Sequence, residues 1–189
     1  MSFTSHPDYT EIIKNSGYLF WNPTDLSKGE AGWGTKLGFV EKGVAWEPGH
    51  GFIELDQPET GDEPVIGIYT GNNVKLAANL RNYNALALGR LFPGLSGTTF
   101  VKIPNTIKTG TNYYANSSYY GQLLYVPSDQ INHPCLLLQK AVPRIQSTAK
   151  VRVSHVDKMI FPCIFTGARK TSGADGIMYV GPISGAVLR

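Results

Sequence analysis

The sequence has few charged residues and no long apolar run. Charged residues make up 16% of its 189 residues, below the roughly 25% that is usual for soluble domains. Either much of the surface is covered by other chains, or a glycine- and tyrosine-rich loop surface replaces charge. No run approaches the roughly 18 apolar residues of a membrane helix, and the N-terminus lacks the apolar core of a secretory signal. We therefore expect a soluble protein made in a cytoplasm, with no membrane partner.

Cysteine is also scarce. The two cysteines, Cys135 and Cys163, both lie in apolar runs. Two free buried thiols are favoured over a structural disulfide. The chain length fits a single domain, 1–189, that can bury a sizeable core without covalent cross-links.

Motifs for catalysis, nucleotide binding or metal binding are missing or incomplete. GEAGWGTK at 29–36 resembles a phosphate-binding loop, but its Thr and Lys are in reversed order and it opens a strand. SHVD at 154–157 brings Ser, His and Asp together, but neighbours in an extended segment point to opposite faces, and no nucleophile elbow is present. The histidines show no metal spacing. We expect no enzymatic activity, no catalytic or metal residues, and no cofactor.

The pattern of apolar and polar residues predicts about eight to ten strands. Hairpin-like spacing indicates antiparallel pairing. The expected class is mainly β, an antiparallel β-sandwich or barrel with long loops and one short helix. The glycines at 38 and 43 are expected to mark bulges or bends. Outside the segment discussed next, the expected strands are 17–22, 35–46, 121–127, 134–142, 149–165 and 176–188.

The stretch 67–94 changes its period partway along. The segments 64–70 and 73–81 alternate as strands, and Gly71–Asn72–Asn73 between them predicts a hairpin turn. From Asn82 onward the apolar residues follow helical spacing, which predicts a short α-helix over 82–92. The residues expected to pack this helix on the sheet are Ala85, Leu88, Leu91 and Phe92.

Two segments are predicted as long loops. Residues 47–63 carry six carboxylates and no Lys or Arg, so we expect an exposed arm or loop with a short strand at 52–55. Residues 94–120 are polar and aromatic, and loops of that length are generally functional or mobile. Their tyrosine pairs at 113–114 and 119–120 can stack on sugars or bases, or pack on a neighbouring subunit.

Charge is divided unevenly along the chain. Residues 1–95 hold 7 Lys/Arg and 11 Asp/Glu, a net of −4, and residues 96–189 hold 10 and 3, a net of +7. The basic residues are spread singly, so sequence-specific DNA recognition is not expected. The division suits complementary faces on neighbouring subunits, and it also suits a solvated surface.

The stretch TGDEPVIGIYTGNNVKLAANLRNYNALALGRLFPG at 60–94 resembles tail tube proteins of tailed bacteriophages. In that family a strand hairpin leads into a short helix that packs across a β-sandwich. The resemblance implies a structural protein whose six copies form a ring, each giving four strands to one barrel around a channel. The strands favoured for the channel are 35–46, 65–70, 73–81 and 149–165.

The resemblance also implies partners and a location. Rings would stack head to tail into the tube of the virion tail, assembled in the bacterial host cytoplasm, with DNA passing through non-specifically. Tape-measure, terminator, baseplate and sheath proteins would be the other partners. Two alternatives stay open: a monomeric β-barrel or sandwich that binds a small ligand or carbohydrate, and a baseplate hub or distal tail component.

Within this resemblance, the acidic segment is expected to contact basic residues of the C-terminal half in the next ring. Each exposed ion pair contributes about 0–1 kcal/mol, so the charges would set register more than affinity. The acidic residues are Glu54, Asp56, Glu59, Asp62 and Glu63, and the basic residues are Lys102, Lys108, Lys140, Arg144 and Lys150.

Overall fold

The computed structural model describes residues 15–56, 64–81, 84, 120–145, 160–168 and 176–188, without the side chains of 50, 52–56, 64–71 and 145. Short 3-10 helices and antiparallel strands make up these segments. In chain order they are β1 (Gly17–Trp21), η1 (Leu26–Gly32), β2 (Thr35–Asp56), β3 (Pro64–Arg81), β4 (Gly121–Pro127), β5 (Cys135–Ile145), β6 (Phe161–Gly167), β7 (Met178–Gly181) and η2 (Ile183–Gly185).

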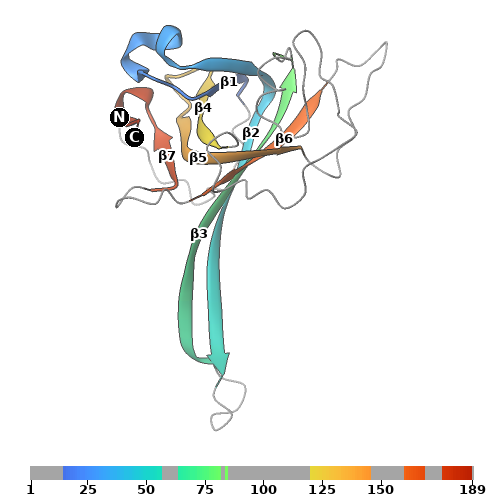
Figure 1. The fold of residues 1–189 in the computed structure, drawn as a ribbon, viewed down its shortest axis with the longest axis vertical. Coiled ribbons are helices and arrows are strands. Elements are labelled where there is room, and N and C mark those ends of the chain that lie inside the picture. Colours follow the sequence, from blue (N-terminus) through green and yellow to red (C-terminus); the bar gives the residue numbers. More distant parts are fainter. Residues whose placement is uncertain are drawn as a thin grey trace.

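Six of the strands form a closed antiparallel barrel (Figure 1). Their order is β4-β1-β2-β3-β6-β5, and pairing between β4 and β5 closes the barrel. Strand β7 pairs with residues 135–138 of β5, on the edge of β5 away from β4, where β6 pairs with residues 141–145. The expected class, a mainly β antiparallel barrel or sandwich, is therefore confirmed.

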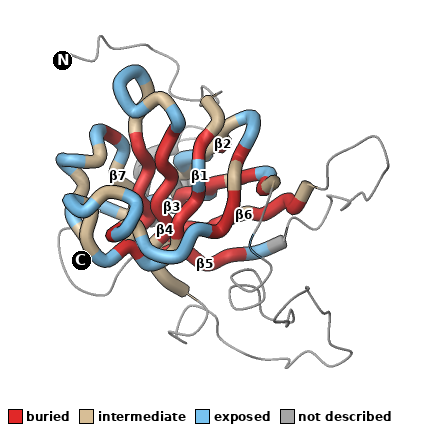
Figure 2. The backbone as a smooth tube through the Cα atoms, turned by 90° about the horizontal axis from the view of Figure 1, so that it is seen from above, coloured by how far each residue is buried: buried red, intermediate tan, exposed pale blue. Residues whose placement is uncertain are grey.

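The barrel interior is filled by side chains. Along β3, the residues at every second position from Val74 to Leu80 are buried, while those between them face outward, as strand alternation requires. Figure 2 shows the buried positions concentrated along the barrel strands. The interior cluster also contains Leu19, Leu37, Val40, Val44, Leu123, Tyr125, Leu136, Leu138, Ala141, Phe161, Cys163 and Phe165. A barrel of this size has a packed core rather than a channel.

A second apolar cluster lies on the outside of the barrel. Its buried residues come from β1, β4 and β5, and η1, β7 and η2 cover them. This layer explains why β5 is apolar on both faces: Leu136 and Leu138 belong to the interior, and Leu137 to the outer cluster.

Both cysteines are free and buried, as expected. Cys135 lies in the outer cluster and Cys163 in the interior. Burial raises the pKa of the Cys135 thiol to about 11 and raises the pKa of the Cys163 thiol further, because desolvation disfavours the thiolate.

The predicted hairpin at Gly71–Asn73 is wrong. Strand β3 runs without interruption from Pro64 to Arg81. The turn-prone residues stay extended because each has a partner on β2: Gly71 pairs with Gly51, Asn72 with His50, and Asn73 with Gly49. One of the register shifts of this pair lies beside this point, where Thr70 has no partner between Gly71 and Tyr69.

The acidic segment is also different from the prediction. Strand β2 continues through it to Asp56, so residues 47–56 are strand rather than loop, although the short strand at 52–55 is confirmed within it. The reason is the partner strand: pairing with β3 supplies hydrogen bonds that local propensity does not reveal.

The remaining expectations fall partly outside the described residues. The strands at 17–22, 121–127 and 134–142 are confirmed. The predicted helix over 82–92 lies outside except for Asn84, whose N–H donates to the carbonyl of Leu37 at 2.9 Å. The loop at 94–120 is described only at Tyr120.

Candidate assembly interface

The most unusual feature of the molecule is a two-stranded ribbon that extends beyond the barrel. Strand β2 pairs with β1 only over 35–40, and β3 pairs with β6 only over 74–80. Beyond these limits β2 and β3 continue paired with each other as far as Asp56 and Pro64. Figure 1 shows this ribbon extending away from the barrel. We call residues 49–56 and 64–73 the arm; eight extended residues span about 26 Å.

The register gives the outer part of the arm two different faces. Ile53 is paired with Ile68, and Leu55 with Ile66, so these two pairs place four aliphatic residues on one face. The alternate pairs, Phe52 with Tyr69 and Glu54 with Gly67, occupy the other face. An isolated two-stranded ribbon is marginally stable in water, and an apolar face needs a covering layer. Among the described residues, no third strand pairs with the arm.

A bulge marks the place where β2 leaves the barrel. Val40 pairs with Leu80 and Val44 with Ala78, so three residues of β2 oppose one residue of β3. Gly43 adopts a φ of 77° there, which favours glycine, so the expected bulge at this position is confirmed. Arg81 forms an ion pair with Glu41 beside the bulge. This pair ties the bulge of β2 to the end of β3.

The sheet containing the arm has two open edges. Strands β2, β3, β6 and β5 are neighbours in that order. The outer side of β2 is paired with β1 only through Val40, and the outer side of β5 is paired with β4 only through Ala141. In the described part of the chain, residues 41–56 of β2 and 142–145 of β5 therefore have a paired strand on one side only, β3 and β6 respectively. Open edges are templates for pairing with another chain.

A proline lies on each open edge. Pro48 of β2 has Val74 as its register partner, and Pro143 of β5 has Phe165. Proline has no N–H donor and is tolerated in a sheet where its nitrogen faces away from the neighbouring strand. Both prolines therefore face the open edges, and they limit the registers in which another strand can pair there.

The structure places four of the predicted inter-ring residues. Glu54 and Asp56 lie on β2 in the arm, and Lys140 and Arg144 lie on β5, so they belong to opposite edges of one sheet. The others lie outside the described residues: Glu59, Asp62, Glu63, Lys102, Lys108 and Lys150, together with the helix-packing residues Ala85, Leu88, Leu91 and Phe92.

The two basic residues of β5 have partners on the same chain. The Lys140 ammonium lies 4.2 Å from the centre of the Tyr120 ring, a cation–π geometry. Arg144 is exposed and donates from Nη2 to Thr166 Oγ1 at 2.7 Å. A guanidinium has five N–H donors, so this bond leaves Arg144 able to bind a carboxylate.

The segment that resembles a phosphate loop has a structural role. Lys36 begins β2 rather than a helix; its ammonium contacts Glu30 Oε1 at 2.8 Å and lies 3.7 Å from the centre of the Tyr18 ring. These contacts tie the start of β2 to η1 and β1.

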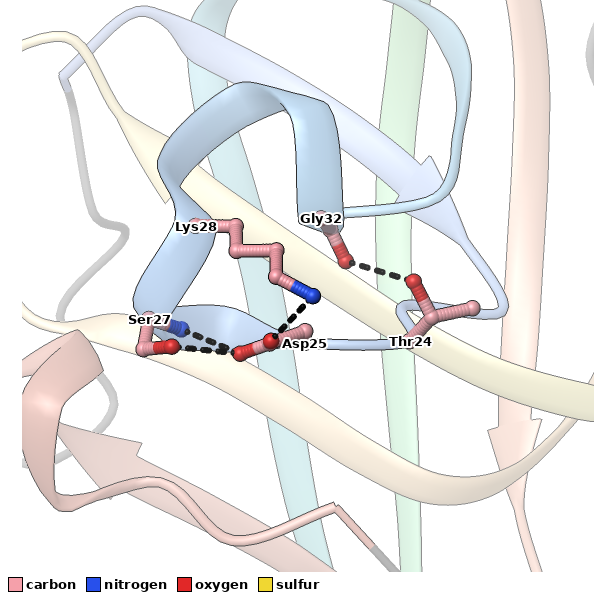
Figure 3. A network of polar contacts seen from close by, with 5 residues as sticks. All are labelled: Thr24, Asp25, Ser27, Lys28 and Gly32. Atoms are coloured by element: carbon pink, nitrogen blue, oxygen red, sulfur yellow. Dashed lines mark hydrogen bonds and ion pairs between the residues drawn. The ribbon is translucent and has the colours of Figure 1, made fainter.

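Helix η1 is held by its own polar network (Figure 3). The Asp25 carboxylate accepts from the Ser27 N–H at 3.0 Å and from the Ser27 hydroxyl at 2.6 Å, and it lies 3.0 Å from the Lys28 ammonium. The bond from the Ser27 side chain is the main cause that lowers the pKa of Asp25 to about 2. Asp25 therefore acts as an N-cap.

No protein-family model matches this chain, and no curated protein is similar to it. Within the described ranges, no three His, Cys, Asp or Glu side chains gather to hold a metal ion. The same part of the chain contains no helix long and apolar enough to span a membrane.

Sequence reasoning expected an exposed arm or loop at 47–63, but it missed that the arm is a ribbon of β2 paired with β3 and that the sheet has open edges, although a signal was present. Ile53 and Leu55 precede the turn-prone residues 57–63, and Ile66 and Ile68 follow them. This symmetry is typical of a hairpin. Gly71, Asn72 and Asn73 gave a stronger local turn signal, so the hairpin turn was predicted there instead.

Proposed function

We propose that this protein is a structural subunit that assembles into hexameric rings, and that these rings stack into a tail tube of a tailed bacteriophage. The observation that carries the proposal is the sheet β2-β3-β6-β5, which has an open edge on each side. A sheet with two open edges is completed when identical copies join edge to edge.

The strand directions suit a ring. Neighbours in the sheet are antiparallel, so β2 and β5, separated by two strands, run in opposite directions. When copies are related by rotation about one axis, β5 of each copy meets β2 of the next with antiparallel polarity. The contact is heterologous, and a closed ring leaves no edge exposed.

This arrangement revises the strands proposed for the channel. The segments 65–70 and 73–81 belong to one strand, β3, so they count once. Strand β5 supplies the fourth strand, and β2, β3, β6 and β5 together form the wall contributed by each copy. DNA would pass along this wall without sequence-specific contacts.

The arm suits the stacking of rings. It extends beyond the barrel and carries aliphatic positions on one face, and burying such a face against the next ring would stabilise the stack. In this proposal the ends of the tube bind the terminator, tape-measure and baseplate proteins.

The ligand-binding alternative is less well supported. The interior of the six-stranded barrel is occupied by large side chains, among them Phe165 and Tyr125, which are fully buried. A small ligand would need to displace part of this packed core, at a cost of several kcal/mol.

Light scattering with size-exclusion chromatography, followed by negative-stain electron microscopy, tests the proposal. We expect the purified chain to form rings and tubes as its concentration rises. A particle that stays at the 20.6 kDa of one chain at every concentration, with no ring in the micrographs, would refute self-assembly.

An arm-deleted variant tests the role of the ribbon. Residues 49–73 are replaced by Asn-Gly, which joins the register partners Pro48 and Val74 through a favourable hairpin turn. The pairings of β1 with β2 and of β3 with β6 lie outside the deletion, so we expect a folded barrel that no longer forms tubes. Tubes of normal length from this variant would exclude a stacking role for the arm.

A second variant keeps the arm at full length. Ile53→Lys with Ile68→Lys places charges at the aliphatic positions, and Tyr69→Lys is the matched control at the opposite face. We expect the double variant to lose stacked tubes and the control to retain them. Equal effects of both would show that the two faces are equivalent.

A further inference from the structure

The two open edges carry opposite charge. Strand β2 beyond Val40 holds four carboxylates and one ammonium, a net of −3. Strand β5 holds two cations, Lys140 and Arg144, and no carboxylate, a net of +2. The carboxylates of β2 are Glu41, Glu47, Glu54 and Asp56, and its ammonium is Lys42.

The register places charges of both edges on the outer face of the sheet. Glu47 is opposite Lys75, which in turn pairs with Thr166. Arg144 is opposite Ile164, which pairs with Ala77, and Ala77 pairs with Ala45. These two rows are adjacent, and Glu47 and Arg144, at opposite ends of them, are both exposed.

We propose that neighbouring copies join laterally, β5 of one beside β2 of the next, with Arg144 binding carboxylates of the partner's β2 edge. The occupant of each open edge is therefore a second copy of this chain. This inference rests on the proposed ring and adds its polarity and its recognition chemistry. It uses Arg144 within a ring, whereas the sequence suggested that it acts between stacked rings.

Three observations favour this pairing over the symmetric ones. Two β2 edges brought together would oppose net charges of −3 each, and two β5 edges would oppose Arg144 of each copy, the one charge on residues 142–145. Like charges across an interface are unfavourable. The β2–β5 pair is electrostatically complementary. It also uses both open edges at every contact, whereas each symmetric pairing leaves the other edge of both copies open.

The other charged residues near these edges have a partner on the same chain or lie beside a residue of opposite charge. Glu41 is bound to Arg81 on its own chain, and Lys42 beside it is the one cation on the acidic edge. Glu47 has Lys75 as its cross-strand neighbour. Arg144 contacts a neutral hydroxyl, that of Thr166. Arg144 is therefore the cation whose guanidinium is not yet matched to a carboxylate among the described residues.

Charge exchange tests the lateral contact between β5 of one copy and β2 of the next. Arg144→Glu with Lys140→Glu makes the β5 edge acidic, and we expect the concentration needed for half-assembly to rise about tenfold or more. Glu47→Lys with Glu54→Lys and Asp56→Lys reverses the β2 edge and should act similarly. All five substitutions together restore opposite charges and should recover assembly. If the combined variant fails to assemble although circular dichroism shows that both parent variants are folded, the proposed contact between β5 and β2 is wrong.

Zero-length carbodiimide cross-linking locates the contact independently. Arg144→Lys supplies a reactive amine, and assembled rings are cross-linked, digested and sequenced by mass spectrometry. We expect new cross-links from position 144 to carboxylates of β2, and a denaturing ladder that ends at the hexamer. Cross-links to other segments, or a ladder continuing past six copies, would instead indicate a contact between rings.

These outcomes separate the two proposals. If the wild-type chain never assembles, the proposed function fails. If it assembles while the charge variants behave as wild type and position 144 cross-links elsewhere, the proposed ring still stands and the proposed contact between β5 and β2 is wrong.

Discussion

Two adjacent leucines on β5 test whether a single chain buries both faces of that strand. Leu136 belongs to the barrel interior and Leu137 to the outer cluster beneath η1 and η2, and both are 0% exposed. If the outer face were covered only by another copy, Leu137→Ala would leave a dilute monomer unaffected. The structure instead predicts that both substitutions destabilise the monomer.

The size of the effect follows from the burial. Replacing a fully buried leucine by alanine removes apolar contacts and leaves a cavity, which costs about 2–5 kcal/mol. For a chain of this length, that corresponds to a decrease in Tm of about 4–20 °C. We expect Leu136→Ala and Leu137→Ala each to lower the free energy of unfolding by an amount within this range. The two losses should lie in the same half of the range.

The assay is urea unfolding, followed by tryptophan fluorescence, of the arm-deleted variant, so that assembly does not contribute to stability. Val187→Ala is the matched control, because Val187 is 54% exposed and surface changes usually stay within about 0.5 kcal/mol. A free energy of unfolding for Leu137→Ala within about 0.5 kcal/mol of the parent, alongside a large loss for Leu136→Ala, would refute the outer layer.

Three further predictions concern backbone, thiols and the cap. Gly34 has a φ of 86°, and a Cβ there would meet the carbonyl oxygens of Trp21 and Asn22, so Gly34→Ala should lower the free energy of unfolding by about 1–3 kcal/mol, measured by urea unfolding. Cys135 and Cys163 are buried with raised thiol pKa values, so a thiol reagent should react with neither in the native protein and with both in denaturant. Because their folded pKa values lie above those of the unfolded chain, stability should also fall as pH rises above about 9. The lowered pKa of Asp25, about 2, predicts the opposite pH dependence. The stabilisation by its carboxylate is present above about pH 4 and is lost as pH falls through 2, so Asp25→Ala should lower Tm more at pH 7 than at pH 1.5.

The class of fold was readable from the sequence because it depends on period. Alternation along Val74–Leu80 and the apolar run at 135–138 require strands with at least one buried face, whatever their partners are. The strands β1 and β4 were predicted nearly at their observed limits, since turn residues flank them on both sides. Strand β5 was predicted to end at Val142, before Pro143, but it continues to Ile145 because β6 pairs with it there.

The strand pairing that builds the arm could not be predicted because turn propensity is local and strand pairing is not. Gly71, Asn72 and Asn73 favour a turn in isolation, yet the register with Gly51, His50 and Gly49 keeps them extended. Only a partner strand distant in sequence supplies the hydrogen bonds that decide between these two states.

By itself the sequence determined that this protein is built from antiparallel strands, that its thiols are buried, and that its net charge is negative in the first half and positive in the second. These properties follow from composition and from periodicity over a few residues. The tertiary structure alone decided that the barrel is closed within one chain and that β2 and β3, paired with each other, extend beyond the barrel. It also decided that an acidic strand and a basic strand form opposite edges of one sheet. Those outcomes depend on which distant segments pair, and the hydrogen bonds and packing that select among pairings exist only after the chain has folded.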